Sequence, residues 1–371
     1  MDTHLATLTL RTGEQANVRR VTGPEPARAA QVLALLHHKS PLYLEPAARA
    51  LAAGLLGLGA HFYVAAIGDE LAANVTIHDT FPEAVGLLMH VYTAPAHRRK
   101  GLAQALMQAA VDDFGDRSGR LIYLNTEYGS SPFRIYQRVG FEPVGRRGDM
   151  RRQSVPHAEE QFFAPGETHV VDLDWGDWPL LDALYLCEGG WHVRSLYYEQ
   201  WGVCGAEGEF PALRQALGAG VMLTEQALKT PAGAIVAHGF VANLDAPASR
   251  VHARPAERLR HSWSKIRYLA QGRRGLARWR LIYRARRLTQ LLPRRGFVLD
   301  FFAHPGSEAH TATLLEALQP LPTPLHAAAD PQDAGKIAAL RALGFGERRR
   351  FRNVLPTEHG PRSIHLYRRD A

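Results

Sequence analysis

The residues that could do chemistry gather first in the stretch VYTAPAHRRKGLAQAL, residues 91–106. Three consecutive cations, residues 98–100, are followed by Gly101 and then by an apolar pattern with helical spacing. The first turn of a helix carries N–H groups without intrahelical acceptors and the positive end of the helix dipole. Because glycine has no Cβ, the backbone at Gly101 can approach a ligand closely, and Ala103 keeps the next approach small. The pattern predicts an anion site that a pyrophosphate would fit; a solvated basic helix terminus is the competing interpretation.

Elements on both sides must position this stretch. The run VGLLMHVYT (85–93) before it is rich in β-branched, aromatic and large apolar side chains, which is typical of a strand. Farther upstream, residues 24–38 and 46–56 are expected as helices, and a hairpin follows them. Downstream, RLIYLNTE (120–127) predicts a strand and SSPFRIYQRVGF (130–141) a capped helix that ends at a glycine. The first half is therefore expected to be a mixed α/β unit, with the cations at a strand-to-helix turn.

The order of these elements resembles the GNAT N-acetyltransferase superfamily over roughly residues 16–150, through a strand ending in VYTAP, the loop HRRKGLA and the later IYQRVGF. The resemblance implies an α/β fold with a mixed sheet (α+β), of the GNAT acyl-CoA N-acyltransferase type, and acetyl-CoA as co-substrate. In that family the loop binds the pyrophosphate largely through backbone N–H groups, and the strand before it pairs with the pantetheine arm. The cofactor-binding residues implied here are Val91, Thr93, Arg98, Arg99, Lys100, Gly101, Leu102, Ala103, Ser131 and Tyr136.

The resemblance also implies a reaction, in which an amine attacks a thioester and negative charge develops on oxygen and then on sulfur. Tyr136 stands where the family's phenol protonates the departing thiolate, and a phenol still holds its proton at neutral pH. A core tyrosine that packs a helix on the sheet is the alternative. Many relatives carry an asparagine at the position of Gly129, and Ser130 or Ser131 would have to replace its contact.

The sequence does not decide which residue is the general base. A carboxylate or histidine, or a water held by one, is expected near the acetyl group. Glu83 and His90 are the catalytic candidates beside the tyrosine, and His78 and Glu127 are further ones. Because side chains alternate across a strand, His90 should point away from the side that Val91 faces. For each candidate, a solvated or structurally satisfied polar residue is the competing interpretation.

The second half repeats the pattern more weakly. FVLDFFAHP (297–305) resembles LLMHVYTAP in being a strand that ends at proline, and AGKIAALRALGF (334–345) resembles PFRIYQRVGF. We therefore expect two domains, a catalytic GNAT domain over 1–155 and a second GNAT-like domain over 156–371.

The second domain has lost the residues for the chemistry. The loop GSEAHTA after Pro305 holds no Arg-x-x-Gly and no cation, so a pyrophosphate has no charge partner there. Leu340 stands in the place of Tyr136. The second copy should therefore be degenerate and should not bind acetyl-CoA in the usual way.

The net charge of +8 is concentrated in one segment, 254–295, which holds fourteen Lys or Arg and a single acid. Its apolar residues, including Leu276, Trp279 and Tyr283, have helical spacing and predict one or two amphipathic helices, broken around residues 272–275. Three interpretations stay open. The segment is an inserted hairpin with its apolar face packed on the body, a cradle for an acidic acceptor or partner, or a contact for nucleic acid or an anionic membrane.

Composition is ordinary for a soluble globular protein, with 46% hydrophobic and 22% charged residues. The N-terminus lacks a secretory pattern, and the longest apolar run, residues 50–60, is too short to span a bilayer, so a cytoplasmic location is expected. Cys187 and Cys204 lack metal-ligand spacing and are expected to be reduced thiols, and no metal is expected.

These observations predict an N-acetyltransferase that transfers the acetyl group of acetyl-CoA to a primary amine. The alternative is a non-catalytic acyl-CoA-sensing or nucleic-acid-binding module that reuses the fold. A longer acyl donor and either a monomer or a homodimer stay open. The amine-bearing acceptor is also open: a small molecule such as a polyamine, aminoglycoside or metabolite, or a protein or peptide.

Overall fold

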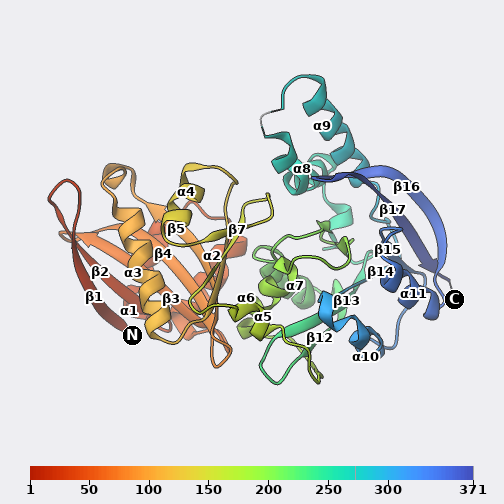
Figure 1. Ribbon diagram of the computed structural model, residues 1–371, viewed down its shortest axis with the longest axis horizontal. Coiled ribbons are helices and arrows are strands. Elements are labelled where there is room, and N and C mark those ends of the chain that lie inside the picture. The colour runs from red at the N-terminus through yellow and green to blue at the C-terminus, as the bar shows by residue number, and fades with distance from the viewer. Residues whose placement is uncertain (272, 371) are drawn as a thin grey trace. The chain divides into compact units, whose positions relative to one another are not determined.

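The computed structural model describes residues 1–271 and 273–370, which fold as two compact units (Figure 1). Unit 1 contains residues 1–163 and two later segments, 174–183 and 205–211, and unit 2 contains the rest. Helices α6 (Trp178–Leu186) and α7 (Glu209–Gly218) each begin in unit 1 and end in unit 2. The predicted division after residue 155 stays a prediction, and it does not anticipate that two later segments belong to unit 1.

Unit 1 is built on a sheet of eight strands. In spatial order they are β1 (Asp2–Thr9), β2 (Gln15–Thr22), β3 (Gly59–Ile67), β4 (Glu70–Thr80), β5 (Val85–Thr93), β6 (Leu121–Asn125), β8 (Asp149–Gln153) and β7 (Glu142–Val144). All neighbours are antiparallel except β5 and β6, which are parallel. A parallel pair needs a crossover, and here it is α3 (Leu102–Asp116).

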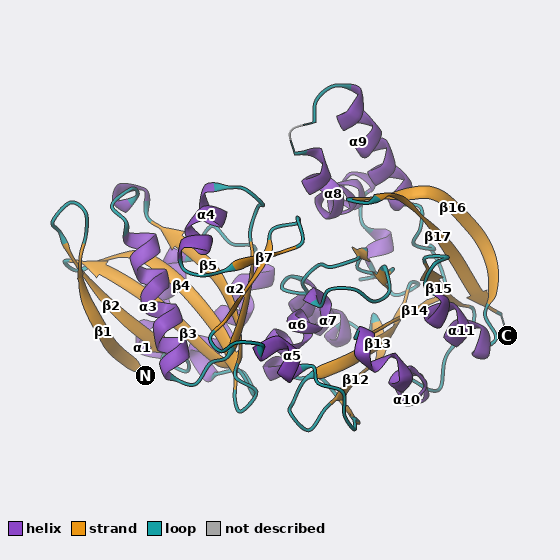
Figure 2. Cartoon of the chain, in the orientation of Figure 1, coloured by secondary structure: helices purple, strands orange, loops and turns teal. Residues whose placement is uncertain are grey.

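Helices cover both faces of this sheet (Figure 2). On one face, α3 and α4 (Ser131–Arg138) share a buried apolar cluster with β3, β4 and β5. On the other face, α1 (Pro26–Leu35) and α2 (Pro41–Ala53) pack on β2 and β3. The short helix α5 (Ala158–Phe162) follows the sheet. The predicted start of the second helix at residue 46 is wrong, because Pro41 takes the first helical turn and the helix continues through Pro46 despite the hydrogen bond that a proline removes.

Unit 2 holds a sheet of seven strands. In spatial order they are β9 (His169–Val171), β12 (Met222–Lys229), β13 (Ile235–Asn243), β14 (Phe297–Ala303), β15 (Leu325–Ala329), β17 (Gly360–Arg369) and β16 (Gly346–Thr357). Only β14 and β15 are parallel. The order of pairings, three antiparallel, one parallel and two antiparallel, is the same as that from β2 to β7 in unit 1.

The remaining elements of unit 2 include two short strands, β10 (Val193–Ser195) and β11 (Gln200–Trp201), and four helices, α8 (Pro255–Ile266), α9 (Leu276–Leu288), α10 (Thr311–Ala317) and α11 (Ala334–Ala342). The arginine-rich segment forms α8 and α9, which pack on each other (Figure 1); Gly272, where the break was expected, lies outside the described residues. Among the described residues, no helix has both the length and the apolar character needed to cross a membrane.

The apolar face expected for α9 is wrong. Leu276, Trp279 and Tyr283 are exposed, the indole of Trp279 to 68%. The helix buries Leu281, Ala285 and Leu288 instead. Both sets have helical spacing, so periodicity alone could not choose between them.

Candidate functional site

An opening between β5 and β6 is the first feature of the site. The two strands pair only through three residue pairs, from Val85 with Leu121 to Leu87 with Tyr123. Beyond Leu87, β5 continues to Thr93 and stays paired with β4, while β6 pairs with β8 along its whole length. In the described chain, the facing edges beyond Leu87 therefore have no strand partner. An extended ligand could pair there through its main-chain-like amides, as an added strand does.

A β-bulge in β5 determines which face of the sheet the side chains at this opening point to. The register between β4 and β5 shifts between Asn74 and Thr76, and His90 has a positive φ of 57°. The Nδ2 of Asn74 donates to the carbonyl oxygen of His90 at 2.9 Å and so stabilises the bulge. Val91 packs in the α3-side cluster, whereas the His90 ring meets that of Tyr43 of α2 at 5.5 Å. His90 and Val91 face opposite sides of the sheet, as side-chain alternation predicts.

The loop after β5 presents backbone N–H groups. It runs through a short 3-10 helix, Pro95–His97, to the N-terminus of α3, where Gly101 is the N-cap with a φ of 87°. The first helical hydrogen bond is donated by the amide of Ala105 to the carbonyl of Gly101, so the amides of residues 102–104 have no acceptor within the helix. The left-handed backbone at Gly101 suits glycine and turns the loop toward this open helix end.

Cations surround this helix end, and two of them have partners. Arg98 donates from Nε to the carbonyl oxygen of Thr93 at 3.1 Å, and Lys100 Nζ lies 2.8 Å from Glu14 Oε1. Arg99 is exposed, with a positive φ of 65°. Sequence reasoning missed Arg11, whose side chain lies 3.4 Å from the position that a Cβ on Gly101 would take. The hairpin between β1 and β2 thus adds a fourth cation to the loop.

Helix α4 positions Tyr136. Ser130 is its N-cap and accepts a hydrogen bond from the amide of Phe133 at 3.2 Å, so its hydroxyl already serves the helix, while Ser131 is exposed at the first helical position. Tyr136 is 6% exposed, and its ring contacts Phe141 edge-on. Burial raises the pKa of the Tyr136 phenol above its usual value, and the charge of Glu207 raises it further. The phenol is therefore protonated at neutral pH and can donate.

A loop of unit 1 that sequence reasoning missed lies beside these residues, at 205–211. Two hydrogen bonds anchor it: the amide of Ala206 donates to Asp182 Oδ1 at 2.6 Å, and Trp178 Nε1 donates to the carbonyl oxygen of Glu207 at 3.1 Å. The loop also passes close to α2, because a Cβ on Gly208 would stand 2.8 Å from the Tyr43 hydroxyl. These contacts hold Glu207 in place.

The electrostatics of this loop are unusual. Burial raises the pKa of the partly buried Glu207 to about 7; Lys39 opposes the rise, and Asp149 and Glu209 add to it. The same crowding raises the pKa of Asp182, where burial is the largest cause. The charges of Glu207, Asp149 and Glu209 therefore all raise the pKa of Asp182, and the charge of Glu207 also raises that of Tyr136.

Two buried histidines line the α2 side of the bulge. His78 is 1% exposed and its ring lies 5.0 Å from that of Trp178, while His90 lies 6.5 Å from His78, both distances between ring centroids. Neither ring nitrogen of His78 has a hydrogen-bond partner among the described residues. Burial lowers the pKa of His78 to about 3 and that of His90 well below its usual value. Both rings are therefore neutral at pH 7.

The structure brings only some of the predicted residues together. His90 contacts Tyr43 of α2, whereas Tyr136 lies in the apolar cluster on the α3 side of the sheet. The charge of Glu207 raises the pKa of both phenols. Glu83 lies in the turn before β5, at the end where β5 and β6 are paired and not at the opening. Glu127 is exposed after the end of β6.

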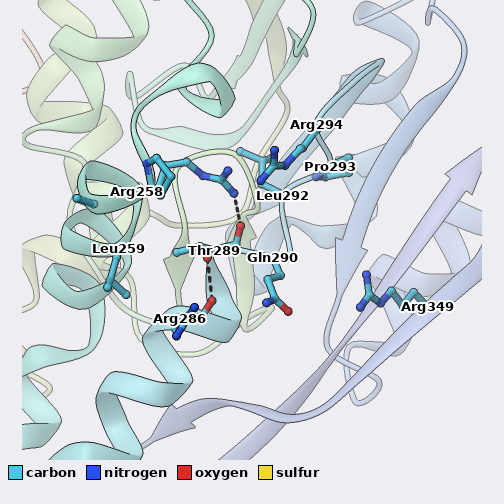
Figure 3. A pocket seen from close by; sticks show the side chains of 11 residues that line it. Arg258, Leu259, Arg286, Thr289, Gln290, Leu292, Pro293, Arg294 and Arg349 are labelled. Atoms are coloured by element: carbon cyan, nitrogen blue, oxygen red, sulfur yellow. Dashed lines mark hydrogen bonds between the residues drawn. The ribbon is translucent and has the colours of Figure 1, made fainter.

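A second candidate site is a groove in unit 2 with a volume of about 660 Å³ (Figure 3). Its charged lining residues are Arg258 of α8, Arg286 of α9, Arg294 of the segment between α9 and β14, and Arg349 of β16. Arg258 donates to the carbonyl oxygen of Thr289. Burial lowers the pKa of Arg258, and Arg294 lowers it further, which indicates crowded positive charge. None of the described residues that line the groove is acidic.

Residues 59–143 match a family model described as an acetyltransferase (GNAT) domain. This part of the chain is therefore similar to GNAT acetyltransferase domains. The matched stretch runs from β3 into β7 and so includes the opening, the loop and α4. The match supports acyl transfer in general. The segments 174–183 and 205–211, which complete unit 1, lie outside the match.

The chain is also similar to solved GNAT structures. The GNAT domain of S. lividans PAT is 18% identical with a TM-score of 0.32, over 39% of this chain and 93% of that chain. A GNAT family N-acetyltransferase from Escherichia coli, in complex with CoA, is 16% identical with a TM-score of 0.33, over 39% and 84%. A GNAT family acetyltransferase from Brucella melitensis, in complex with acetyl-CoA, is 16% identical with a TM-score of 0.30, over 38% and 89%. No curated protein matches the chain.

Proposed function

We propose that the chain is an N-acetyltransferase that transfers the acetyl group of acetyl-CoA to a primary amine. The observation that carries the proposal is the opening between β5 and β6, which leads to the open N-terminus of α3 within the matched GNAT stretch. An extended arm with amide groups suits the unpaired edge of β5 near Val91 and Thr93. A pyrophosphate suits the helix end and its cations.

The residues of the loop would each make a different contact with acetyl-CoA. The amides of Leu102 and Ala103 would donate to the pyrophosphate oxygens, since the helix leaves the amides of its first turn free, and Gly101 would allow the ligand to approach closely. The charges of Arg98, Arg99 and Lys100 would add attraction, and Arg11 is placed to do the same. Ser131 is exposed at the start of α4 and is available for a contact of its hydroxyl with the ligand.

The reaction proceeds by direct attack. The uncharged amine attacks the thioester carbonyl carbon, a C–N bond forms, and the C–S bond then breaks to release the CoA thiolate. Tyr136 is the proton donor to that thiolate, and its buried phenol keeps its proton until then. The nitrogen loses a proton before attack and another as the amide forms.

We further propose that unit 2 is a degenerate second copy of the same fold. The identical order of strand pairings supports this, as does a parallel pair that is again short, Phe297 with Leu325 and Val298 with His326. In unit 2, however, other residues of the same chain contact β14 beyond its two pairs with β15. Residues 195–197 donate three hydrogen bonds to Asp300, and Lys336 donates to the carbonyl oxygens of Val193 and Phe301.

The test of the proposed function is a calorimetric titration of the full chain with acetyl-CoA, followed by thiol release with a panel of primary amines. We expect saturable binding and thiol release with at least one of L-lysine, spermidine, kanamycin and a lysine-containing peptide. Absence of acetyl-CoA binding would overturn the proposal. Binding without thiol release for any amine would favour the non-catalytic acyl-CoA sensor.

A second candidate function is binding of a phosphate-bearing anion at the groove of unit 2. The observation that favours it is four arginines on one groove with no acidic lining residue among those described. Arginine pairs well with phosphate oxygens because its guanidinium donates two parallel hydrogen bonds.

A further inference from the structure

We propose that Glu207 is the general base of the acetyl transfer and takes the proton from the acceptor ammonium. This inference rests on the proposed function. It assigns the missing base to a residue outside the matched GNAT stretch, on the loop of unit 1 between β11 and α7.

The first argument is position. The carbonyl of Glu207 is fixed by Trp178, and the next residue, Gly208, passes the hydroxyl of Tyr43 so closely that a Cβ there would stand 2.8 Å from it. The Tyr43 ring in turn contacts His90, which lies on β5 beyond its last pair with β6. The backbone at Glu207 and Gly208 thus lies on the side of the sheet that His90 faces, next to the opening.

The second argument is the relation to Tyr136. The charge of Glu207 reaches the phenols of Tyr136 and Tyr43 and raises the pKa of each, with burial as the larger cause in both. A proton donor for the thiolate and a proton acceptor for the amine must both act at the thioester carbon, and the charge of Glu207 reaches the phenol proposed as the donor. Environments that keep one group protonated and the other ready to accept a proton are typical of acid–base pairs.

The third argument is that the other candidates fit less well. Burial holds the pKa of His78 and His90 too low for either to keep a proton taken from an ammonium. Asp182 accepts the amide of Ala206 and Asp149 accepts Asn125 Nδ2 at 2.6 Å, so both are engaged in the structure.

The charged groups around Glu207 predict how it titrates. Lys39 of the segment between α1 and α2 lowers its pKa, and Asp149 of β8 and Glu209 of α7 raise it; the net pKa is about 7. Asp182 of α6, Tyr43 and Tyr136 also face this region. A base works best when its pKa is near the operating pH, so Glu207 is suited to neutral solution.

The step balances as follows. The carboxylate of Glu207 takes one proton from the acceptor ammonium, which frees the nitrogen lone pair. That lone pair forms the C–N bond while the C–S electrons leave on sulfur. The second proton of the nitrogen replaces the one that Tyr136 gives to the thiolate, and Glu207 returns its proton to solvent. One amide, one free thiol and one proton result.

The test compares Glu207→Gln with Glu209→Gln, a matched change two residues away, and uses two acceptors. One is the best amine of the panel, an ammonium that needs a base, and the other is hydroxylamine, which is already uncharged at neutral pH. For Glu207→Gln we expect kcat/KM with the amine to fall by about 100-fold at pH 7, the usual size of a general-base contribution. The hydroxylamine rate and the Kd for acetyl-CoA should change by less than about threefold, since neither needs the base.

The pH profile separates a base from a structural residue. In the wild type, kcat/KM should fall about tenfold per pH unit below pH 7 as Glu207 gains its proton, and this limb should vanish in Glu207→Gln. Glu209→Gln should keep the limb but move it to lower pH, because a negative neighbour is lost. Equal losses with both acceptors, or an unchanged acid limb in Glu207→Gln, would overturn the proposal. A wild type that does not bind acetyl-CoA, or binds it without transfer, refutes the proposed function instead.

Discussion

At the scale of single residues, a substitution at Tyr136 is expected to change kcat without changing the affinity for acetyl-CoA. Tyr136→Phe keeps the ring that packs beside Phe141 and removes only the hydroxyl. We expect kcat to fall by about 100-fold, because the thiolate loses its proton donor, while the Kd for acetyl-CoA changes by less than about threefold. Steady-state thiol release and calorimetry check this. An unaffected kcat would mean that the tyrosine only packs the helix.

Glu207 also makes a prediction about stability that needs no acceptor. Its folded pKa of about 7 lies above that of an exposed glutamate, so the folded state disfavours the carboxylate. The destabilisation is absent below the unfolded pKa and complete above pH 7. Glu207→Gln should therefore raise Tm at pH 8 and leave it nearly unchanged at pH 4. Thermal unfolding at both pH values measures this, and a variant with a lower Tm at pH 8 would contradict the assignment.

Residues that belong to a short motif were accessible from the sequence, and those assembled by the fold were not. Gly101 could be recognised because glycine after a strand and before a helix has a definite use, and the structure gives it a left-handed φ of 87°. Glu207 gave no comparable signal. Its environment depends on Trp178, Tyr43 and Asp149, which come from distant parts of the chain. Burial of that kind arises only in the folded chain.

At the scale of elements, the turn between β5 and α3 predicts the effect of a side chain at Gly101. Gly101→Glu would put a carboxylate at the open helix end and strain a left-handed backbone by about 1 kcal/mol. We expect the affinity for acetyl-CoA to fall by at least about 100-fold, through repulsion at the pyrophosphate site. Calorimetry measures it.

The matched control is Gly220→Glu, in the turn after α7 of unit 2. Gly220 has a φ of 68° and open space around its Cβ position, so the control carries the same charge and a similar backbone strain. Its affinity for acetyl-CoA should equal that of the wild type. If both variants bind normally, the loop assignment is wrong.

The α8 and α9 helices of unit 2 make the second element-scale prediction. If the groove binds phosphate-bearing anions, pyrophosphate or a single-stranded oligonucleotide should bind with an affinity that falls as salt rises. Arg286→Gln combined with Arg294→Gln should weaken binding and reduce the salt slope by about 1 to 2, because each removed cation is one lost phosphate contact. Arg273→Gln with Arg274→Gln, outside the groove, is the control. Equal effects of the two pairs would show that the segment acts through its total charge.

Helices and strands were predictable where the sequence pattern was compatible with only one secondary structure. The strands from β3 to β6, the hairpin turn at Gly68 and the helix before Gly140 follow from periodicity and turn residues. The bulge at His90 and the buried face of α9 do not. The bulge depends on the side chain of Asn74 on the neighbouring strand, and α9 chooses its face by what it packs against.

At the scale of the whole molecule, the two sheets share one order of pairings but differ in what lies at the end of the parallel pair. In unit 1 the edge of β5 beyond Leu87 has no strand partner in the described chain. In unit 2 the corresponding stretch of β14 is contacted by β10 and by Lys336 of α11. The sequence predicted the loss of the cationic loop in the second half but not that the chain would cover the strand.

This difference predicts that one chain binds one acetyl-CoA. Lys336→Met would remove a buried ammonium that holds Val193 to Phe301, and would leave the buried Asp300 without its cationic neighbour. Leaving two buried carbonyl oxygens without their donor costs about 1 to 3 kcal/mol each, so unit 2 should unfold at lower denaturant. The stoichiometry and the Kd should stay as in the wild type, because the proposed acetyl-CoA site belongs to unit 1. Calorimetry and urea unfolding of both proteins measure these quantities. A second acetyl-CoA per chain, in either protein, would mean that unit 2 keeps a working site and is not a degenerate copy.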